Sequence, residues 1–292
     1  MEGGTAIDGL TACAIIAKAI GYAAALLAMG GPLFVMAFRQ APATVLQMAR
    51  QIAVAAAMIG IAVLAVRFGI RAARISGMGF AGAVDPMMLG FVWDSPLGTA
   101  AIWRAAGYLC VLGLMLPKRG GVAVSLIGAG LLAVSYTRVG HALSDPQMML
   151  SALLVVHLLA VALWVAALLP LRRAASVPAG AALLHDFGVL ASVTVPILIV
   201  AGLGFAWIMA GSLWALIGTA YGLMLLAKVA LVSILLMLAA LNKWRLVPAL
   251  ARGLPEADKA LRRAITLEVA IVGLILLATA TLTSVTTPPI HL

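Results

Sequence analysis

The sequence contains few charged residues and very few acidic ones. Only 10% of its 292 residues are charged, with 9 Asp and Glu against 19 Lys and Arg. Soluble domains carry about a quarter charged residues, so an ordinary soluble fold is excluded. The net charge of +10 alone would suit a nucleic-acid-binding protein. The basic residues, however, are scattered in short segments between apolar runs, which membrane orientation explains better, and no nucleic-acid partner is expected.

Cysteine pairs and nucleotide-binding motifs are also missing. The two cysteines, Cys13 and Cys110, form no C-x-x-C pattern, which excludes a paired-cysteine zinc site and a thioredoxin-like redox motif. No Walker A or kinase signature is present, so direct use of ATP is not expected. We expect a membrane transporter rather than an enzyme.

Long apolar runs dominate what is present. Hydrophobic residues make up 65% of the chain, and several runs exceed the roughly 20 residues that span a bilayer. We predict an all-α polytopic membrane protein with about eight transmembrane helices in a bundle, forming a single transmembrane domain over 1–292. The expected spans are about 11–38, 46–70, 97–117, 121–140, 148–171, 186–211, 216–242 and 261–284.

Basic residues predict the orientation of these spans. Of the 19 Lys and Arg, 12 follow the odd-numbered spans, which places both termini outside the cytoplasm. Arg67, Arg71 and Arg74 depart from this distribution, and we interpret them as an interfacial extension of the second span. On this topology the polar loop 72–96 faces outside, and the basic loop 243–263 faces the cytoplasm.

Two histidines and two methionines form the candidate metal site. His157 lies in the middle of an apolar span, where an ionisable group is a functional hypothesis by default, and His141 lies upstream near the outer edge. Met148 and Met149 lie between them, and imidazole with thioether suits copper. Met149 is the better partner, since it is about 80° from His157 around the helix and Met148 is nearly opposite. The alternative is a neutral His157 that only forms a hydrogen bond across a helix interface.

Other residues extend this hypothesis toward both membrane surfaces. Met78, Met87 and Met88 in the outer loop are candidates for capturing copper, although methionine is also ordinary core filler. His185, at the cytoplasmic edge, is a candidate exit ligand or simply a solvated side chain.

Three intramembrane charges should face the interior of the bundle and find partners. They are Lys18, Lys228 and Glu268. A Lys228–Glu268 pair is one hypothesis, and an arginine, Arg262 or Arg263, near Glu268 is another. Such charges serve either as structural braces or as a proton relay.

Four stretches of the second half carry a family resemblance. They are Gly140-His-Ala142 followed by His157-Leu-Leu-Ala-Val-Ala-Leu-Trp164; Asp186-Phe-Gly188; Thr219-Ala-Tyr-Gly222 continuing to Lys228 and Asn242-Lys-Trp-Arg-Leu-Val-Pro248; and Leu261-Arg-Arg-Ala-Ile-Thr-Leu-Glu268 with Thr286-Thr-Pro-Pro289. In order and spacing they are similar to the copper-resistance D family (CopD/PcoD domain), bacterial inner-membrane proteins implicated in copper uptake. The similarity covers roughly 130–290, whereas 1–120 contains less distinctive helices.

The chain also departs from the family pattern at two places. Trp164-Val-Ala-Ala167 stands where the family usually reads Trp-x-Gly-Gly, and Thr219-Ala-Tyr-Gly222 stands where it reads Thr-Pro-Tyr-Gly. Alanine still permits close helix packing, and neither change removes a candidate ligand.

The resemblance implies a multi-pass protein of the bacterial cytoplasmic membrane that transports copper, as Cu(I) or Cu(II), from periplasm to cytoplasm. It also implies a periplasmic copper-binding protein that delivers the metal, and contact with the lipid bilayer. Two alternatives stay open at this point. One is a b-type haem redox protein, which needs two axial histidines at similar depth. The other is a copper-binding sensor or subunit that does not transport.

Overall fold

The protein is described by a computed structural model that covers the chain except residues 1–7, 117–118, 140–146, 178–179, 211–212 and 286–292. Within the described residues every regular element is helical, which confirms the all-α prediction. The elements are α1 (Gly9–Ala37), α2 (Ala43–Ser76), η1 (Gly79–Val84), α3 (Pro86–Trp93), α4 (Pro96–Val111), η2 (Leu112–Met115), α5 (Arg119–Ser135), η3 (Tyr136–Arg138), α6 (Gln147–Ala174), α7 (Gly180–Ala210), α8 (Leu213–Gly218), α9 (Ala220–Leu241), η5 (Asn242–Leu246), α10 (Val247–Ala251) and α11 (Ala257–Val285).

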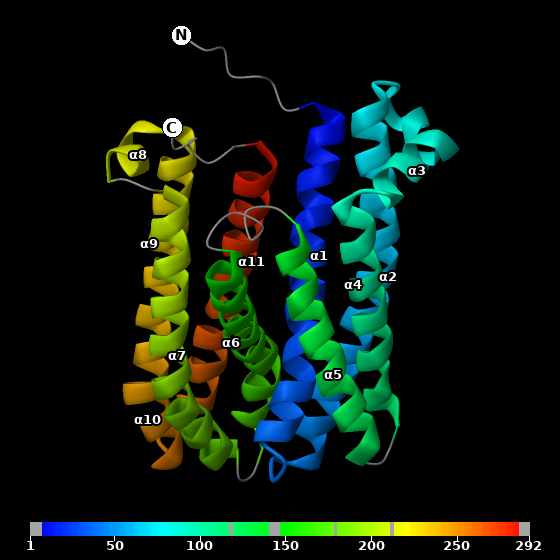
Figure 1. Cartoon of the computed structure of the whole chain (residues 1–292). Coiled ribbons are helices and arrows are strands. Elements are labelled where there is room, and N and C mark those ends of the chain that lie inside the picture. The colour runs from blue at the N-terminus through cyan, green and yellow to red at the C-terminus, as the bar shows by residue number, and fades with distance from the viewer. Residues whose placement is uncertain (1–7, 117–118, 140–146, 178–179, 211–212, 286–292) are drawn as a thin grey trace.

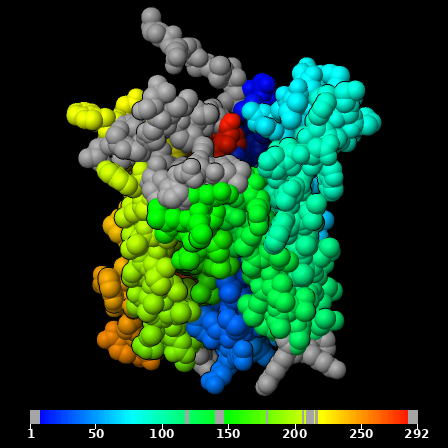
Figure 2. Space-filling model, in the orientation of Figure 1, coloured from blue at the N-terminus to red at the C-terminus, as the bar shows by residue number. Residues whose placement is uncertain are grey.

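Eight of the described helical segments are long and apolar enough to cross a membrane, in agreement with the predicted number of spans. They lie side by side as one bundle (Figures 1 and 2). Because the number of spans is even, α1 begins and α11 ends at the same end of the bundle, where α3 also lies (Figure 1). The side of the membrane that this end faces stays a prediction.

The predicted polar loop 72–96 is mostly helical, so that prediction was wrong. The second span continues as α2 to Ser76 and ends at Gly77, whose φ of 68° is the left-handed conformation that glycine adopts without cost. The short helices η1 and α3 follow at once, and the Asp85 carboxylate caps α3 by accepting a hydrogen bond from the Met88 amide at 2.9 Å. Asp, Ser and Gly in this segment therefore end and begin helices rather than form a loop.

The predicted basic loop 243–263 is also mostly helical. The π-helical turn η5 and then α10 continue α9 as far as Ala251, and α11 begins at Ala257. Pro248 is at the start of α10, where a residue without an amide hydrogen is tolerated. Only the short connection 252–256 between these helices is irregular.

Helix α1 is packed against α2, α5, α6 and α11 through small residues. A side chain at Gly30 would overlap the backbone carbonyl of Ala162 in α6, and one at Gly31 would overlap Ala53 in α2. Small residues let helix backbones approach closely in membranes, where apolar burial alone gives little driving force. This contact fixes α6, and with it the candidate ligand His157, against the centre of the bundle.

Candidate metal site

His157 lies in α6, ten residues after the helix begins at Gln147. At 1.5 Å per residue it is about 15 Å along the helix from that end. Its Nδ1 atom is buried and has no hydrogen-bond partner. The backbone of Leu198 in α7 lies close enough to the imidazole to act on it.

This arrangement leaves a buried ring nitrogen without a partner. A neutral imidazole has one donor nitrogen and one acceptor nitrogen, and Nδ1 uses neither capacity within the described residues. Metal-binding histidines commonly donate their other ring nitrogen to a backbone carbonyl, which fixes the ring and its tautomer. The geometry of His157 therefore fits a metal ligand better than a purely structural histidine, whose two nitrogens would both be paired.

Gly202 in α7 makes this geometry possible. A methyl group at Gly202 would lie 3.1 Å from Cε1 and 3.3 Å from Nδ1 of His157. Both distances are shorter than ordinary carbon contacts, so the imidazole packs directly against the backbone of Gly202 and a side chain there would crowd it. Leu198 is one helical turn before Gly202, so both residues lie on the face of α7 that meets His157.

Lys228 in α9 is the charged neighbour of this site. Its ammonium group is close enough to act electrostatically on His157. The predicted Lys228–Glu268 pair is not formed, because Glu268 accepts a hydrogen bond from Asn242 Nδ2 at 2.8 Å. Within the described residues the only ion pair joins Lys259 and Glu256.

Glu268 and Asn242 form a second buried polar site deeper along the bundle. Glu268 is 3% and Asn242 8% exposed, and Asn242 is the first residue of the π-helical turn η5. Asn242 Oδ1 and Arg262 Nε are both buried without a partner. Neither Arg262 nor Arg263 bonds to Glu268 among the described residues, so the second hypothesis for its partner was also wrong. π-Helical turns are frequent at functional sites, and unpaired buried polar atoms mark a place where a ligand or ion fits.

Lys18, the third intramembrane charge, forms a link between the first and last spans. Its Nζ donates to the carbonyl of Thr283 at 2.7 Å and to Ser284 Oγ at 3.4 Å. Because both partners are near the end of α11, Lys18 joins α1 to α11 as a structural brace would.

The candidate methionines lie at the end of the bundle where α6 begins. Met148 and Met149 are on the first turn of α6 with 84% and 48% of their surface exposed. Met149 precedes His157 by eight residues, or about 12 Å along the helix, so the two side chains cannot hold one ion together. Met78 and Met87 are exposed near η1 and α3 at the same end (Figure 1); Met88 is half-buried.

The remaining histidines do not join His157 in the described structure. His141 lies outside the described residues. His185 is exposed near the start of α7, thirteen residues before Leu198, which is about 20 Å along the helix. His157 and His185 are therefore too far apart to be the two axial ligands of one haem. No cluster of three or more His, Cys, Asp or Glu side chains occurs among the described residues, so the structure there contains no ready-made multidentate site of that kind.

Sequence reasoning identified His157 and Lys228 but not that the two are neighbours. It also missed Leu198, Gly202 and Asn242 as parts of the sites. Asn242 was visible only as part of a family-like motif. The periodicity of α7 does not distinguish Gly202 from the other glycines of that helix. The role of Gly202 depends on which helix packs against it.

Two family models match the chain. The model for the N-terminal domain of copper resistance protein D-like proteins matches residues 8–149, and the model for copper resistance protein D matches residues 181–282. His157 lies between the two matched regions, whereas Leu198, Gly202 and Lys228 lie within the second. No curated protein and no solved structure matches the chain. Together the two matched regions cover most of an eight-span helical bundle, so the chain belongs to the copper resistance protein D family.

Proposed function

We propose that this protein carries copper across the bacterial cytoplasmic membrane, from the periplasm to the cytoplasm, and that His157 binds the ion within the bundle. The observation that carries the proposal is the buried, unpartnered Nδ1 of His157 where the ring packs against Gly202. Family membership supports copper as the metal. Imidazole and thioether ligands favour copper over Mg²⁺ or Ca²⁺, which prefer oxygen ligands.

Copper moves in this proposal between successive sites rather than through one fixed cage. The exposed thioethers of Met148 and Met149 receive the ion, with His141 as a further ligand and Met78, Met87 and Met88 as capture groups. A periplasmic copper-binding protein delivers the metal to this end. His157 follows about 12 Å further along α6.

Polar groups in the other half of the bundle continue the route. Asn242 Oδ1 is buried without a partner beside the Glu268 carboxylate, and a carboxylate attracts a cation. Exposed His185, on the first turns of α7, is the proposed last ligand before the ion leaves. Conduction requires that each site bind the ion strongly enough to admit it and weakly enough to release it, which a series of partial sites achieves.

Lys228 keeps the central site weak. Two like charges in a partly dehydrated interior repel each other more strongly than in water. The Lys228 ammonium therefore opposes long residence of copper on His157. We infer that Lys228 promotes release and is not itself a ligand while protonated.

Metal analysis of the detergent-purified protein tests this proposal. Wild type, His157→Gln and the control Gly204→Ala are loaded with copper under reducing conditions, and copper, iron and the absorbance spectrum are measured. A methyl group at Gly204 would lie 3.7 Å from Leu153 Cδ1, an ordinary contact away from the imidazole. We expect copper to be retained in wild type and Gly204→Ala and lost in His157→Gln. A Soret band with iron would instead support the haem alternative, and copper binding without uptake into liposomes would support the non-transporting subunit.

A further inference from the structure

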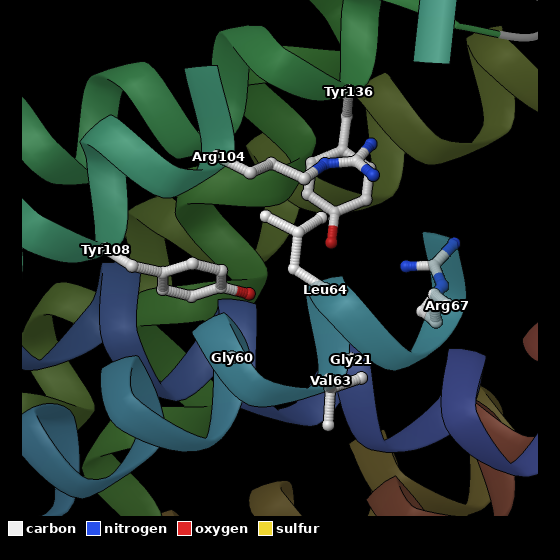
Figure 3. Close-up of a pocket in the computed structure, with 8 residues that line it drawn as sticks. All are labelled: Gly21, Gly60, Val63, Leu64, Arg67, Arg104, Tyr108 and Tyr136. Atoms are coloured by element: carbon white, nitrogen blue, oxygen red, sulfur yellow. The ribbon is translucent and has the colours of Figure 1, made fainter. Parts of the chain in front are cut away.

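One of the basic residues that depart from the positive-inside distribution, Arg67, lines a small cavity in the bundle. Arg67 of α2 and Arg104 of α4 both line it, together with Tyr108, Tyr136 and the backbone of Gly21 in α1. Figure 3 shows the two guanidinium groups and the two tyrosine hydroxyls facing a common space. None of these residues takes part in the copper route proposed above.

Arg104 is buried without an acidic partner. It is 6% exposed, its Nε donates to Ser135 Oγ at 3.1 Å, and its guanidinium lies 4.2 Å from the centre of the Tyr136 ring. Buried arginines are almost always paired with a negative charge. Neither Arg104 nor Arg67 forms an ion pair in the part of the chain that the structure describes. Two guanidinium groups on one cavity also repel each other, so an anion there would lower the energy of both.

Further cations extend from the cavity to the surface. Lys18 is close enough to Arg67, Arg71, Arg74 and Arg104 to experience the charge of all four. Arg71 and Arg74 are exposed on the next two turns of α2. Among the described residues, the carboxylate that reaches this group is Asp8, which acts on the outermost arginine, Arg74, and already accepts a hydrogen bond from the Thr11 amide at 2.6 Å. The positive charge around the cavity itself is therefore not neutralised by the described residues.

The arginines of α2 beside the cavity extend beyond the length of a membrane span. Arg67 is 24 residues beyond the start of α2 at Ala43, which is about 36 Å along the helix. The hydrocarbon core is about 30 Å thick, so Arg67 and the two arginines beyond it reach the level of lipid phosphates. The cavity itself has room for about one water-sized atom, at 10 Å³.

We propose that this cavity binds a phosphate-type oxyanion, with one oxygen in the cavity between Arg67 and Arg104 and the rest of the group toward Arg71 and Arg74. Guanidinium groups bind phosphate through paired, charge-assisted hydrogen bonds, and the phenol groups supply further donors. Three or more cations suit a phosphate better than a singly charged carboxylate. Gly21 leaves room for the Arg67 guanidinium at the cavity, since a methyl group there would lie 3.3 Å from Arg67 Nη1. The oxyanion is either a lipid headgroup or free phosphate.

Thermal unfolding of the purified, delipidated protein tests this assignment. The probes are inorganic phosphate, short-chain dihexanoyl phosphatidic acid, and chloride at matched ionic strength. We expect the midpoint of unfolding to rise with one or both phosphate probes but not with chloride. Stabilisation by phosphatidic acid alone identifies a lipid headgroup, and stabilisation by both probes shows that the phosphate group itself suffices.

Two variants locate the effect. Arg67→Gln removes a cavity cation that has no ion pair to lose, and Arg39→Gln is a charge-matched control at an exposed site outside the cluster. We expect Arg67→Gln to need about tenfold or more phosphate probe for the same stabilisation, and Arg39→Gln to behave as wild type. Equal stabilisation by chloride, or an unchanged response in Arg67→Gln, would overturn the proposal. Because the readout is unfolding without copper, failure here is distinguishable from failure of the copper proposal.

Discussion

Replacing Gly202 with alanine separates the metal-binding role of His157 from its role in packing. The imidazole is retained in this variant, but the new methyl group crowds its Cε1 and Nδ1 atoms. We expect Gly202→Ala to fold as wild type does and to bind copper 10–100-fold more weakly, the range seen when the surroundings of a metal ligand are disturbed.

The magnitudes follow from the contacts of the new methyl group. It would lie 3.1 Å from Cε1 and 3.3 Å from Nδ1, so the imidazole must shift by a few tenths of an ångström. Alanine is about 1 kcal/mol more favourable than glycine inside a helix, which offsets this crowding. The free energy of unfolding should therefore change by less than about 1 kcal/mol. The methyl group would be nearer to Cε1 than to Nδ1, so it would act by turning the ring and thereby redirecting Nδ1 away from a metal ion about 2 Å from it. The expected loss of affinity corresponds to about 1.4–2.7 kcal/mol.

Competition with a chromogenic Cu(I) chelator measures the affinity, and thermal melts followed by circular dichroism measure the fold. Gly204→Ala is the matched control, because its methyl group would make only an ordinary contact at 3.7 Å with Leu153. Wild-type copper affinity in Gly202→Ala would refute the reasoning, since crowding the imidazole would then leave metal binding unchanged. A large loss of stability in Gly202→Ala alone would show instead that the glycine serves packing.

Three further predictions concern other parts of the bundle. Lys228→Met should tighten copper binding and slow its release, because the ammonium that repels the bound cation is removed and this repulsion is stronger in a dehydrated interior than in water. Stopped-flow transfer of copper to a chelator checks this, and faster release would contradict it. Gly30→Leu should destabilise the protein by at least about 1–3 kcal/mol because the side chain would overlap the α6 backbone. Gly130→Leu is the control, because a side chain there would meet open space. Thermal unfolding in detergent compares the two variants, and equal midpoints of unfolding would count against the packing described. Glu268→Gln and Asn242→Leu should each reduce copper uptake into liposomes while leaving copper binding at His157 intact. Loss of copper binding in either purified variant would instead show that the Glu268–Asn242 site supports the site at His157.

The spans were predictable because each is a long apolar run, and this signal is independent of tertiary contacts. The segment 72–96 was predicted as a loop because it is rich in Gly, Pro, Asp and Ser. Those residues are also the ones that cap helices, and Asp85 and Ser95 do so at the starts of α3 and α4. Composition alone does not separate a loop from two short helices joined by caps.

The candidate site was predictable only where a residue is unusual for its surroundings. His157 and Lys228 are ionisable groups in apolar helices, and each was identified for that reason. The partner of each group depends on how helices that are distant in sequence pack together. Asn242 is adjacent to Glu268 because of the π-helical turn η5, and no periodicity in the sequence indicates such a turn. Gly202 faces His157 for the same kind of reason.

Copper uptake into proteoliposomes tests the central claim most directly. Wild type, His157→Gln and Gly204→Ala are reconstituted at equal density into liposomes that contain a trapped Cu(I) chelator, and the rate of chelator colour change is measured after copper is added outside. We predict uptake by wild type and Gly204→Ala and loss of most uptake by His157→Gln. Uptake by His157→Gln at the wild-type rate would contradict the claim that His157 binds copper on its way through the bundle.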